Sequence, residues 1–276
     1  MKTVSAHGVE IPALGMGTWE LRGEQCARLV EAAIGQGYRH IDTAHMYQNE
    51  REVGEGIRAS GVAREEIFLT TKIWPDCHAA DDFARAVDER LELLDCGPAD
   101  LLLLHWPSRT VPLRETIAAL NKAQAGGLTR HIGISNFTVS QTNEAVQLSD
   151  AALVCNQLEY HPLINQDRLL ATCRANGMAI TAYCPIARNR VADEPVMQEI
   201  AARHGVSPAD ITLAWQMAHG DVMAIPRSSR PERLASNLAA SQLNLSDEEI
   251  AAINTLKAQH VRLCDPASVA PQWDQP

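Results

Sequence analysis

The chain of 276 residues lacks an apolar run that approaches the ~20 residues of a membrane helix. Its first residues, Met1 to His7, lack the apolar segment of a signal peptide. It also lacks an excess of positive charge, and the formal net charge of −10 at pH 7 argues against general binding to nucleic acid or to membrane surfaces. We therefore expect a cytoplasmic protein that binds neither nucleic acid nor a membrane.

A regular spacing of cysteines is missing as well. The seven cysteines are odd in number and scattered, which is typical of reduced thiols in a cytosol. Cys77 and His78 are adjacent, but no second closely spaced pair of ligand residues accompanies them. We therefore expect no metal site.

The chain has no linker rich in proline, serine or glycine, and no shift in composition that would mark a boundary. This predicts one domain over residues 1–276, a length that suits a barrel of roughly 250 residues. No Gly-x-Gly-x-x-Gly motif stands between a strand and a helix, so a Rossmann domain is not expected.

What the sequence does contain is a repeat of short apolar runs that each end in a polar residue suited to chemistry. The runs end at Asp42, Lys72, His105, Asn136, Gln157, Tyr183 and Arg227. Their apolar character on both faces is typical of strands buried in a parallel sheet. In a barrel of alternating strands and helices, the carboxyl ends of all strands open onto one face, where active sites lie. The repeat therefore predicts an enzyme with an α/β fold, a single (β/α)8 TIM barrel.

Helical patterns separate these runs, at about residues 24–36, 49–59, 79–94, 113–125, 139–147, 166–175, 195–203 and 230–239. Residues 4–12 predict a hairpin before the barrel, and a short first strand is expected near Leu14 to Met16. Extra helices are expected at residues 209–218 and, after the capping box Ser246 to Glu249, up to about residue 256. We predict no regular structure from Lys257 onward, and the sequence leaves open which barrel face this tail covers.

Asp42, Lys72 and His105 end three consecutive predicted strands, and Tyr47 lies in the loop after the first of them. Reduction of a carbonyl group needs a proton donor, but a free tyrosine titrates near pH ~10. A desolvated ammonium at Lys72 would lower the pKa of Tyr47, and Asp42 would keep Lys72 charged. His105 would orient the carbonyl oxygen or share its proton.

Other readings of the same residues remain. Taken singly, Asp42 and Lys72 could form a structural ion pair. His105 could be a core or cap residue, and Tyr47 could be a ring on the surface. A barrel aldolase could use Lys72 as a Schiff base, but that chemistry needs a lowered pKa and Asp42 would raise it. A barrel that only binds a ligand to report redox state, without turnover, is a further alternative.

Several motifs resemble those of the aldo-keto reductases along nearly the whole chain. They lie at residues 37–44, Tyr47, 49–50, Gly54, 71–74, 104–107, 133–137, 156–162, 182–185, 225–228 and 232–237. Within this family the chain is most similar to the bacterial reductases of 2,5-diketo-D-gluconate and methylglyoxal. The resemblance implies a monomer that reduces small dicarbonyls and keto-sugar acids with NADPH. It also implies a catalytic tetrad of Asp42, Tyr47, Lys72 and His105, with Tyr47 as the proton donor.

The resemblance further implies that Ser135, Asn136 and Gln157 bind the nicotinamide carboxamide and that Tyr183 stacks on its ring. After the last predicted strand, at the start of a helix, lies a basic cluster suited to a phosphate. It comprises Arg227, Ser228, Ser229, Arg230 and Arg233. The resemblance assigns this cluster to the 2′-phosphate of NADPH, with Asn237 near the adenine. Three positions depart from the usual family residues: Arg227 replaces lysine, Cys184 replaces serine and Ser236 replaces glutamate.

Aromatic residues are scarce, with three phenylalanines, yet there are five tryptophans. Trp19, Trp74 and Trp106 follow predicted strands one, three and four, where aromatic walls would exclude water beside His105. Trp215 lies in an apolar helical run, and we therefore predict that it is a core residue. Arg262 and Trp273 lie in the tail, where Arg262 either meets a substrate carboxylate or forms a surface ion pair.

Overall fold

The computed structural model describes residues 2–275 and begins with an antiparallel hairpin of β1 (Thr3–Ala6) and β2 (Val9–Pro12). Eight parallel strands follow in one sheet. They are β3 (Met16–Gly17), β4 (His40–Asp42), β5 (Phe68–Ile73), β6 (Ala99–Leu104), β7 (Thr129–Ser135), β8 (Leu153–Glu159), β9 (Ala179–Tyr183) and β10 (Val222–Ala224). Each strand pairs with its neighbour in sequence, from β3 through to β10.

The two edges of this sheet meet and close the barrel. Leu14 bridges Ala224, and Gly17 bridges Arg227, both in parallel. A side chain at Gly17 would put its Cβ 2.7 Å from the carbonyl oxygen of Ile225, so the closure needs a residue without one. The predicted (β/α)8 fold is therefore confirmed. The first strand lies slightly later than predicted, because Leu14 contributes only an isolated bridge.

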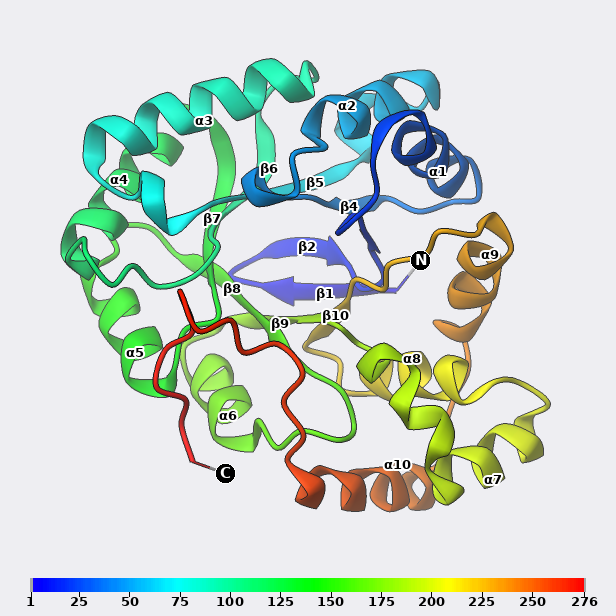
Figure 1. Cartoon of the computed structure of the whole chain (residues 1–276). Coiled ribbons are helices and arrows are strands. Elements are labelled where there is room, and N and C mark those ends of the chain that lie inside the picture. The colour runs from blue at the N-terminus through cyan, green and yellow to red at the C-terminus, as the bar shows by residue number, and fades with distance from the viewer. Residues whose placement is uncertain (1, 276) are drawn as a thin grey trace.

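Helices surround the strands in a ring (Figure 1). They are α1 (Gly23–Gly35), α2 (Glu50–Ala59), α3 (Ala80–Leu94), α4 (Leu113–Ala125), α5 (Val139–Leu148), α6 (Asp167–Ala175), α7 (Pro195–His204), α8 (Pro208–Ala218), α9 (Pro231–Ala240) and α10 (Asp247–Asn254). Both α7 and α8 precede β10, so α8 is the extra helix predicted there. It starts at a capping box of Ser207 and Asp210 with Pro208 at its first position. No helix among residues 2–275 is long and apolar enough to cross a membrane.

The central strands are buried on both faces. All residues of β5, β6 and β8 are buried, which explains their nearly continuous apolar runs. One apolar cluster packs these strands against the helices, and Phe83 and Ile117 are among its buried members. Within this surrounding, Lys72 of β5 is a fully buried cation.

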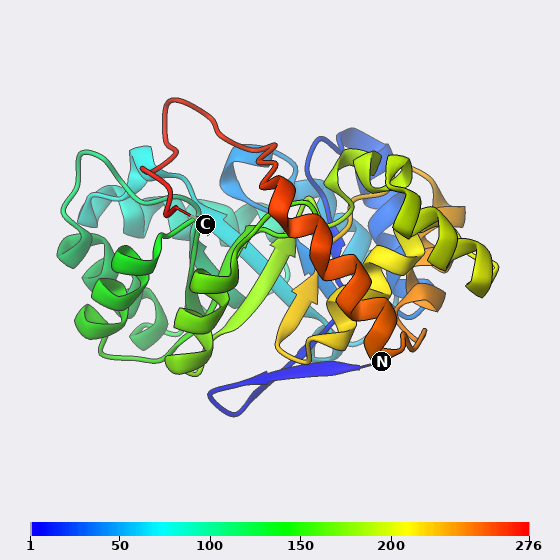
Figure 2. The same cartoon turned by 90° about the horizontal axis from the view of Figure 1, so that it is seen from below.

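The hairpin and the tail lie at opposite ends of the barrel (Figure 2). A short 3-10 helix, η5 (Thr255–Gln259), follows α10, so regular structure runs slightly further than predicted. The chain then crosses the carboxyl end of the strands, where the amides of Leu263 and Cys264 donate to Glu159 at the end of β8. The sequence did not show which face of the barrel the tail covers, and the structure places it at the carboxyl end of the strands.

Candidate active site

The predicted tetrad converges at the carboxyl ends of β4, β5 and β6. Lys72 Nζ donates to Asp42 Oδ1 at 2.5 Å and to the Tyr47 hydroxyl at 3.3 Å. Tyr47 belongs to a 3-10 turn, η1 (His45–Tyr47), which follows β4 closely enough to place its ring over Lys72. The ring centroids of Tyr47 and His105 are 5.7 Å apart. Residues scattered over the sequence therefore form one cluster.

Because Lys72 is buried, the residues around it decide whether its side chain is charged. Lys72 is 0% and Asp42 1% exposed. Burial by itself lowers the pKa of Lys72, but Asp42 and then Tyr47 outweigh it and raise the pKa above its ordinary value. Lys72 is therefore a charged ammonium at neutral pH, which disfavours the Schiff-base alternative.

The pKa of Tyr47 moves in the opposite direction from the one we predicted. Burial raises it, and this effect outweighs the lowering by the Lys72 ammonium. The prediction was wrong in its net direction because the depth of burial is not visible in the sequence. A raised pKa keeps the hydroxyl protonated at neutral pH, which is the state that a proton donor needs.

His105 is an uncharged imidazole in this site. Its burial, and after it the charge of Lys72, lowers the pKa well below the ordinary value. Within residues 2–275 its Nδ1 has no hydrogen-bond partner. Asn136 Nδ2 donates to the backbone oxygen of His105 at 3.0 Å and so fixes the start of this loop. A neutral imidazole can donate its N–H to a carbonyl oxygen.

The residues predicted to bind nicotinamide form one hydrogen-bonded network. The Tyr183 hydroxyl donates to Asn136 Oδ1 at 2.6 Å, and Asn136 Nδ2 donates to Ser135 Oγ at 3.0 Å. Ser135 Oγ in turn donates to the backbone oxygen of Gln157 at 2.9 Å. Amide and hydroxyl groups beside a half-buried aromatic ring suit a planar carboxamide on a ring. These residues therefore fit a nicotinamide.

The same network reaches the tetrad through Gln157. Its Nε2 donates to Asp42 Oδ2 at 2.8 Å, so both carboxylate oxygens of Asp42 are engaged. Sequence reasoning missed this contact. The polar endings of β4 and β8 were the available signal, but the sequence does not say which endings face each other across the barrel.

The basic cluster lies in the loop between β10 and α9, except for Arg233, which lies in the first turn of α9. Ser228 Oγ accepts from the amide of Arg230 at 3.1 Å and shapes the turn into the helix. No side chain caps the start of α9, so its first amides stay available to an anion. Within residues 2–275, Arg230 and Arg233 form no ion pair, whereas Arg227 lies 3.9 Å from Glu20. Exposed, unpaired guanidinium groups at a helix start fit a phosphate monoester.

Two neighbours of this cluster have other contacts. Ser236, which replaces the usual glutamate, donates to Asp210 Oδ1 at 2.7 Å. Asn237 lies beside the hydroxyl of Tyr38, which donates to the backbone oxygen of Leu234 at 3.0 Å. Asn237 therefore lies further along α9 than Arg233 and contacts Tyr38.

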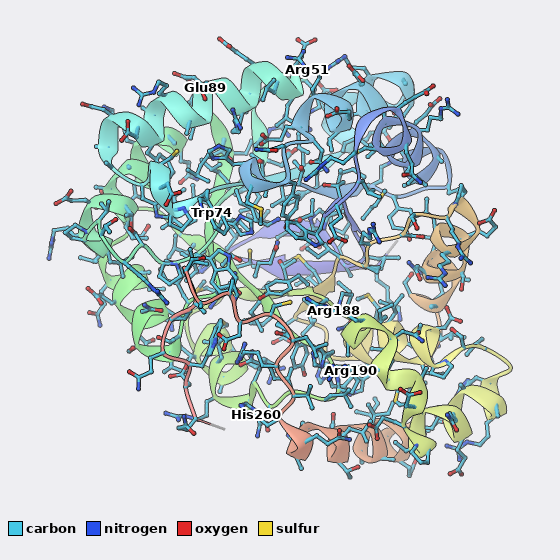
Figure 3. All side chains as sticks on the ribbon, in the orientation of Figure 1. Arg51, Trp74, Glu89, Arg188, Arg190 and His260 are labelled. Carbon is cyan, nitrogen blue, oxygen red and sulfur yellow. The ribbon has the colours of Figure 1, made fainter. Side chains whose placement is uncertain are left out.

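The three predicted aromatic walls divide into two groups. Trp19 packs edge-on against Tyr47 at 5.0 Å, and Trp74 packs edge-on against His105 at 5.2 Å between ring centroids. Trp106 instead packs against Trp273 of the tail at 6.0 Å. Figure 3, viewed from the carboxyl end of the strands, shows Trp74 inside the ring of helices.

Arg262 forms no surface ion pair within residues 2–275. Its guanidinium lies 3.7 Å from the centroid of the Trp273 ring, and its Nη1 has no hydrogen-bond partner there. Trp273 Nε1 donates to Asp265 Oδ1 at 2.8 Å, which holds the ring in place. Of the two alternatives for Arg262, the surface ion pair is therefore wrong.

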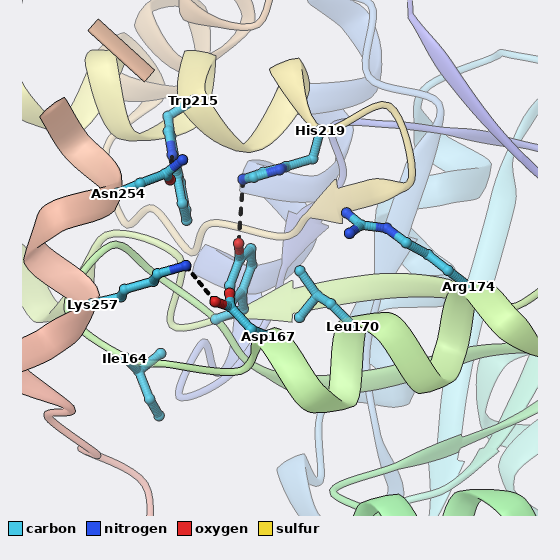
Figure 4. A pocket seen from close by; sticks show the side chains of 9 residues that line it. Ile164, Asp167, Leu170, Arg174, Trp215, His219, Asn254 and Lys257 are labelled. Carbon is cyan, nitrogen blue, oxygen red and sulfur yellow. Dashed lines mark hydrogen bonds and ion pairs between the residues drawn. The ribbon is translucent and has the colours of Figure 1, made fainter. Parts of the chain in front are cut away.

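A separate small pocket of about 70 Å³ lies on the flank of the barrel, between α6, α8 and η5 (Figure 4). Its polar groups already have partners, since Tyr160 and His219 share a hydrogen bond at 3.2 Å and Lys257 pairs with Asp167. Trp215, the predicted core residue, is buried beside it. The pocket contains no tetrad or predicted cofactor residue and is too small for a dinucleotide.

The fold and the site together define a barrel enzyme, and comparisons with known proteins agree. Residues 13–258 match the family model described as the Aldo/keto reductase family. The chain is 39% identical to methylglyoxal reductase DkgB of Yersinia pestis over 269 residues, or 96% of this chain and 100% of that protein.

Solved structures give the same result. One, provisionally named 2,5-diketo-D-gluconic acid reductase B, has a TM-score of 0.97 and 43% identity, and the match covers 100% of this chain and 98% of that one. An aldo-keto reductase of Bombyx mori in complex with NADP has a TM-score of 0.90 and 33% identity, covering 97% and 96%. The chain belongs to the aldo/keto reductase family. It is an oxidoreductase that reduces carbonyl groups with a nicotinamide cofactor.

Proposed function

We propose that this enzyme reduces small dicarbonyls such as methylglyoxal, and keto-sugar acids such as 2,5-diketo-D-gluconate, with NADPH and with Tyr47 as the proton donor. One observation carries the proposal. The Tyr47 hydroxyl is kept protonated by burial yet lies 3.3 Å from the buried ammonium of Lys72. The similarity to a methylglyoxal reductase supports the choice of substrates.

Each tetrad residue has a distinct role in this proposal. When bound, NADPH supplies a hydride to the carbonyl carbon. Tyr47 holds the proton that the carbonyl oxygen takes, and Lys72 stabilises the phenolate that remains. Asp42 keeps Lys72 charged, because their atoms are 2.5 Å apart. His105, neutral at the pH of the reaction, orients the carbonyl oxygen.

The assignment of NADPH rests on two groups of residues. Ser135, Asn136 and Gln157 would hold the carboxamide, and Tyr183 would stack on the ring. The cluster of Arg227, Ser228, Ser229, Arg230 and Arg233 would bind the 2′-phosphate, with Asn237 near the adenine. An NADP complex of a structural relative supports the preference for the phosphorylated cofactor.

Trp19, Trp74 and Trp106 would form the substrate walls with His105. Trp19 and Trp74 contact the tetrad directly, while Trp106 would act together with the tail residue Trp273. The monomeric state, the single domain over residues 1–276 and the cytoplasmic location stay predictions.

The test is consumption of NADPH in the presence of methylglyoxal or 2,5-diketo-D-gluconate, with NADH in parallel and with analysis of the product. We expect one alcohol formed for each NADPH oxidised, and slower turnover with NADH. Tight binding of NADPH without turnover over a broad carbonyl panel would instead support the redox-sensor alternative and contradict the proposal.

A further inference from the structure

Two cysteines from distant parts of the sequence meet at the carboxyl end of the barrel. Cys184 directly follows Tyr183 at the end of β9, and Cys264 lies in the tail. Their sulfur atoms lie within 4.8 Å of each other. Both are free thiols and partly exposed, so that a small reagent can reach them.

Contacts on both sides hold this thiol pair in place. The fully buried Glu159 accepts from the amide of Cys264 at 2.9 Å and from the amide of Leu263 at 2.7 Å, which fixes the tail at this point. Arg188 Nη2 donates to the sulfur of Cys264 at 3.8 Å. Figure 3 labels Arg188 on the same face as the tail. The pair is therefore brought together by a buried carboxylate and lies beside a cation.

We propose that Cys184 and Cys264 are an oxidation site that forms a disulfide and ties the tail to the end of β9. Forming the S–S bond of about 2.05 Å would need the two sulfur atoms to approach each other by rotation of the cysteine side chains. The guanidinium of Arg188 favours the thiolate form, which is the reactive form of cysteine.

The surroundings favour a disulfide over a bound cation. Glu159, whose carboxylate oxygen is the third group of this cluster, already accepts hydrogen bonds from His161 Nε2 and from the two tail amides. Arg188 adds a positive charge at the sulfur atoms, which repels a metal ion.

The oxidant that we propose is a hydroperoxide. A hydrogen bond from Cys264 lowers the pKa of Cys184 against the effect of burial, whereas the pKa of Cys264 is raised. The Cys184 thiolate attacks one peroxide oxygen, so that an S–O bond forms, the O–O bond breaks and hydroxide leaves. The Cys264 sulfur then attacks the sulfur of the sulfenic acid, so that the S–S bond forms and the S–O bond breaks. The oxygen that was bound to Cys184 leaves as water with the proton of Cys264, and the earlier hydroxide takes up the proton that Cys184 had lost. With hydrogen peroxide, two thiols lose two electrons and two water molecules form.

The consequence for activity rests on the proposed function. Cys184 directly follows Tyr183 in the chain, so a bond from Cys184 to Cys264 would hold this part of the tail next to Tyr183. A disulfide would restrain the tail beside Tyr183, on which the nicotinamide would stack. We expect the oxidised enzyme to take up and release NADPH several-fold more slowly than the reduced enzyme.

The disulfide itself is tested without any reference to activity. The full chain is reduced, freed of reductant, treated with hydrogen peroxide, and digested without reductant for mass spectrometry. We expect the seven free thiols to fall to five, and a cross-linked peptide pair that contains Cys184 and Cys264. Cys264→Ser and Cys184→Ser should give no cross-link, while the control Cys77→Ser, also partly exposed, should still give it.

A cross-link between other cysteines, or none at all, would overturn the proposal. So would stoichiometric Zn²⁺ binding that requires both cysteines, since it would make the cluster a metal site. The rate of NADPH binding, followed by protein fluorescence, should slow on oxidation, recover with dithiothreitol and stay unchanged in Cys264→Ser. A cross-link without any change in this rate would contradict the restraint of the tail. Failure of the reduced protein to bind NADPH would count against the proposed function instead.

Discussion

Gln157 at the carboxyl end of β8 donates a hydrogen bond to Oδ2 of Asp42 in β4, at 2.8 Å across the barrel. Asp42 Oδ1 accepts from Lys72, so the buried carboxylate is fully engaged. A residue that we assign to the nicotinamide therefore also positions the ion pair behind the proton donor. Gln157 is thus connected to Tyr47 by three hydrogen bonds, through Asp42 and Lys72.

Replacing Gln157 with leucine should lower the free energy of unfolding by about 1–3 kcal/mol, because a buried carboxylate oxygen loses its donor. Urea unfolding measures this change, and kcat should fall as well. Gln198→Leu is a suitable control, since Gln198 of α7 donates to the backbone oxygen of Ala192 in an exposed contact. Loss of this hydrogen bond should cost less than about 0.5 kcal/mol. Equal effects of the two substitutions would show that the link to Asp42 contributes nothing.

The pH dependence of kcat follows from the pKa shifts of Tyr47 and His105. The raised pKa of Tyr47 keeps the donor protonated, so carbonyl reduction should slow only when the pH rises above about 10. The lowered pKa of His105 keeps it neutral until the pH falls well below about 6.5. Brief assays between these limits should give a flat profile. A decline with rising pH near neutrality would mean that the pKa of Tyr47 is lowered after all.

Arg233→Ala should weaken NADPH binding about tenfold or more, because hydrogen bonds to charged groups contribute about 1.5–3 kcal/mol each. Binding of NADH, which lacks the 2′-phosphate, should change little. Titration of both cofactors by fluorescence measures the difference. Arg28→Ala serves as the control, since Arg28 pairs with Glu24 on α1. An equal loss of affinity for NADPH and NADH would show that the arginine cluster does not bind the 2′-phosphate.

Borohydride treatment in the presence of a carbonyl substrate should leave no substrate-derived mass on Lys72. The raised pKa of Lys72 keeps it an ammonium, which is not a nucleophile. Mass spectrometry of the peptide with residues 68–74 gives the answer. A trapped adduct at this position would restore the aldolase alternative.

The barrel and the convergence of Asp42, Lys72 and His105 could be predicted because both follow from one pattern. Runs that are apolar on both faces indicate buried parallel strands, and the residues that end them share one face. The tail could not be placed in this way, since Leu263 and Cys264 are bound by a single buried carboxylate and follow no periodicity. The pairing of Trp106 with Trp273 depends on the same placement. The net direction of the pKa shift of Tyr47 could not be predicted, because it depends on how deeply the residue is buried in the folded chain.

The central claim is that Tyr47 supplies the proton, and comparison of the wild type with Tyr47→Phe tests it most directly. The hydroxyl is lost while the ring that packs against Trp19 and His105 is kept. With methylglyoxal and NADPH, we predict that kcat falls by about 10²–10⁴-fold while NADPH binding is unchanged. Turnover at the wild-type rate in Tyr47→Phe would contradict the mechanism.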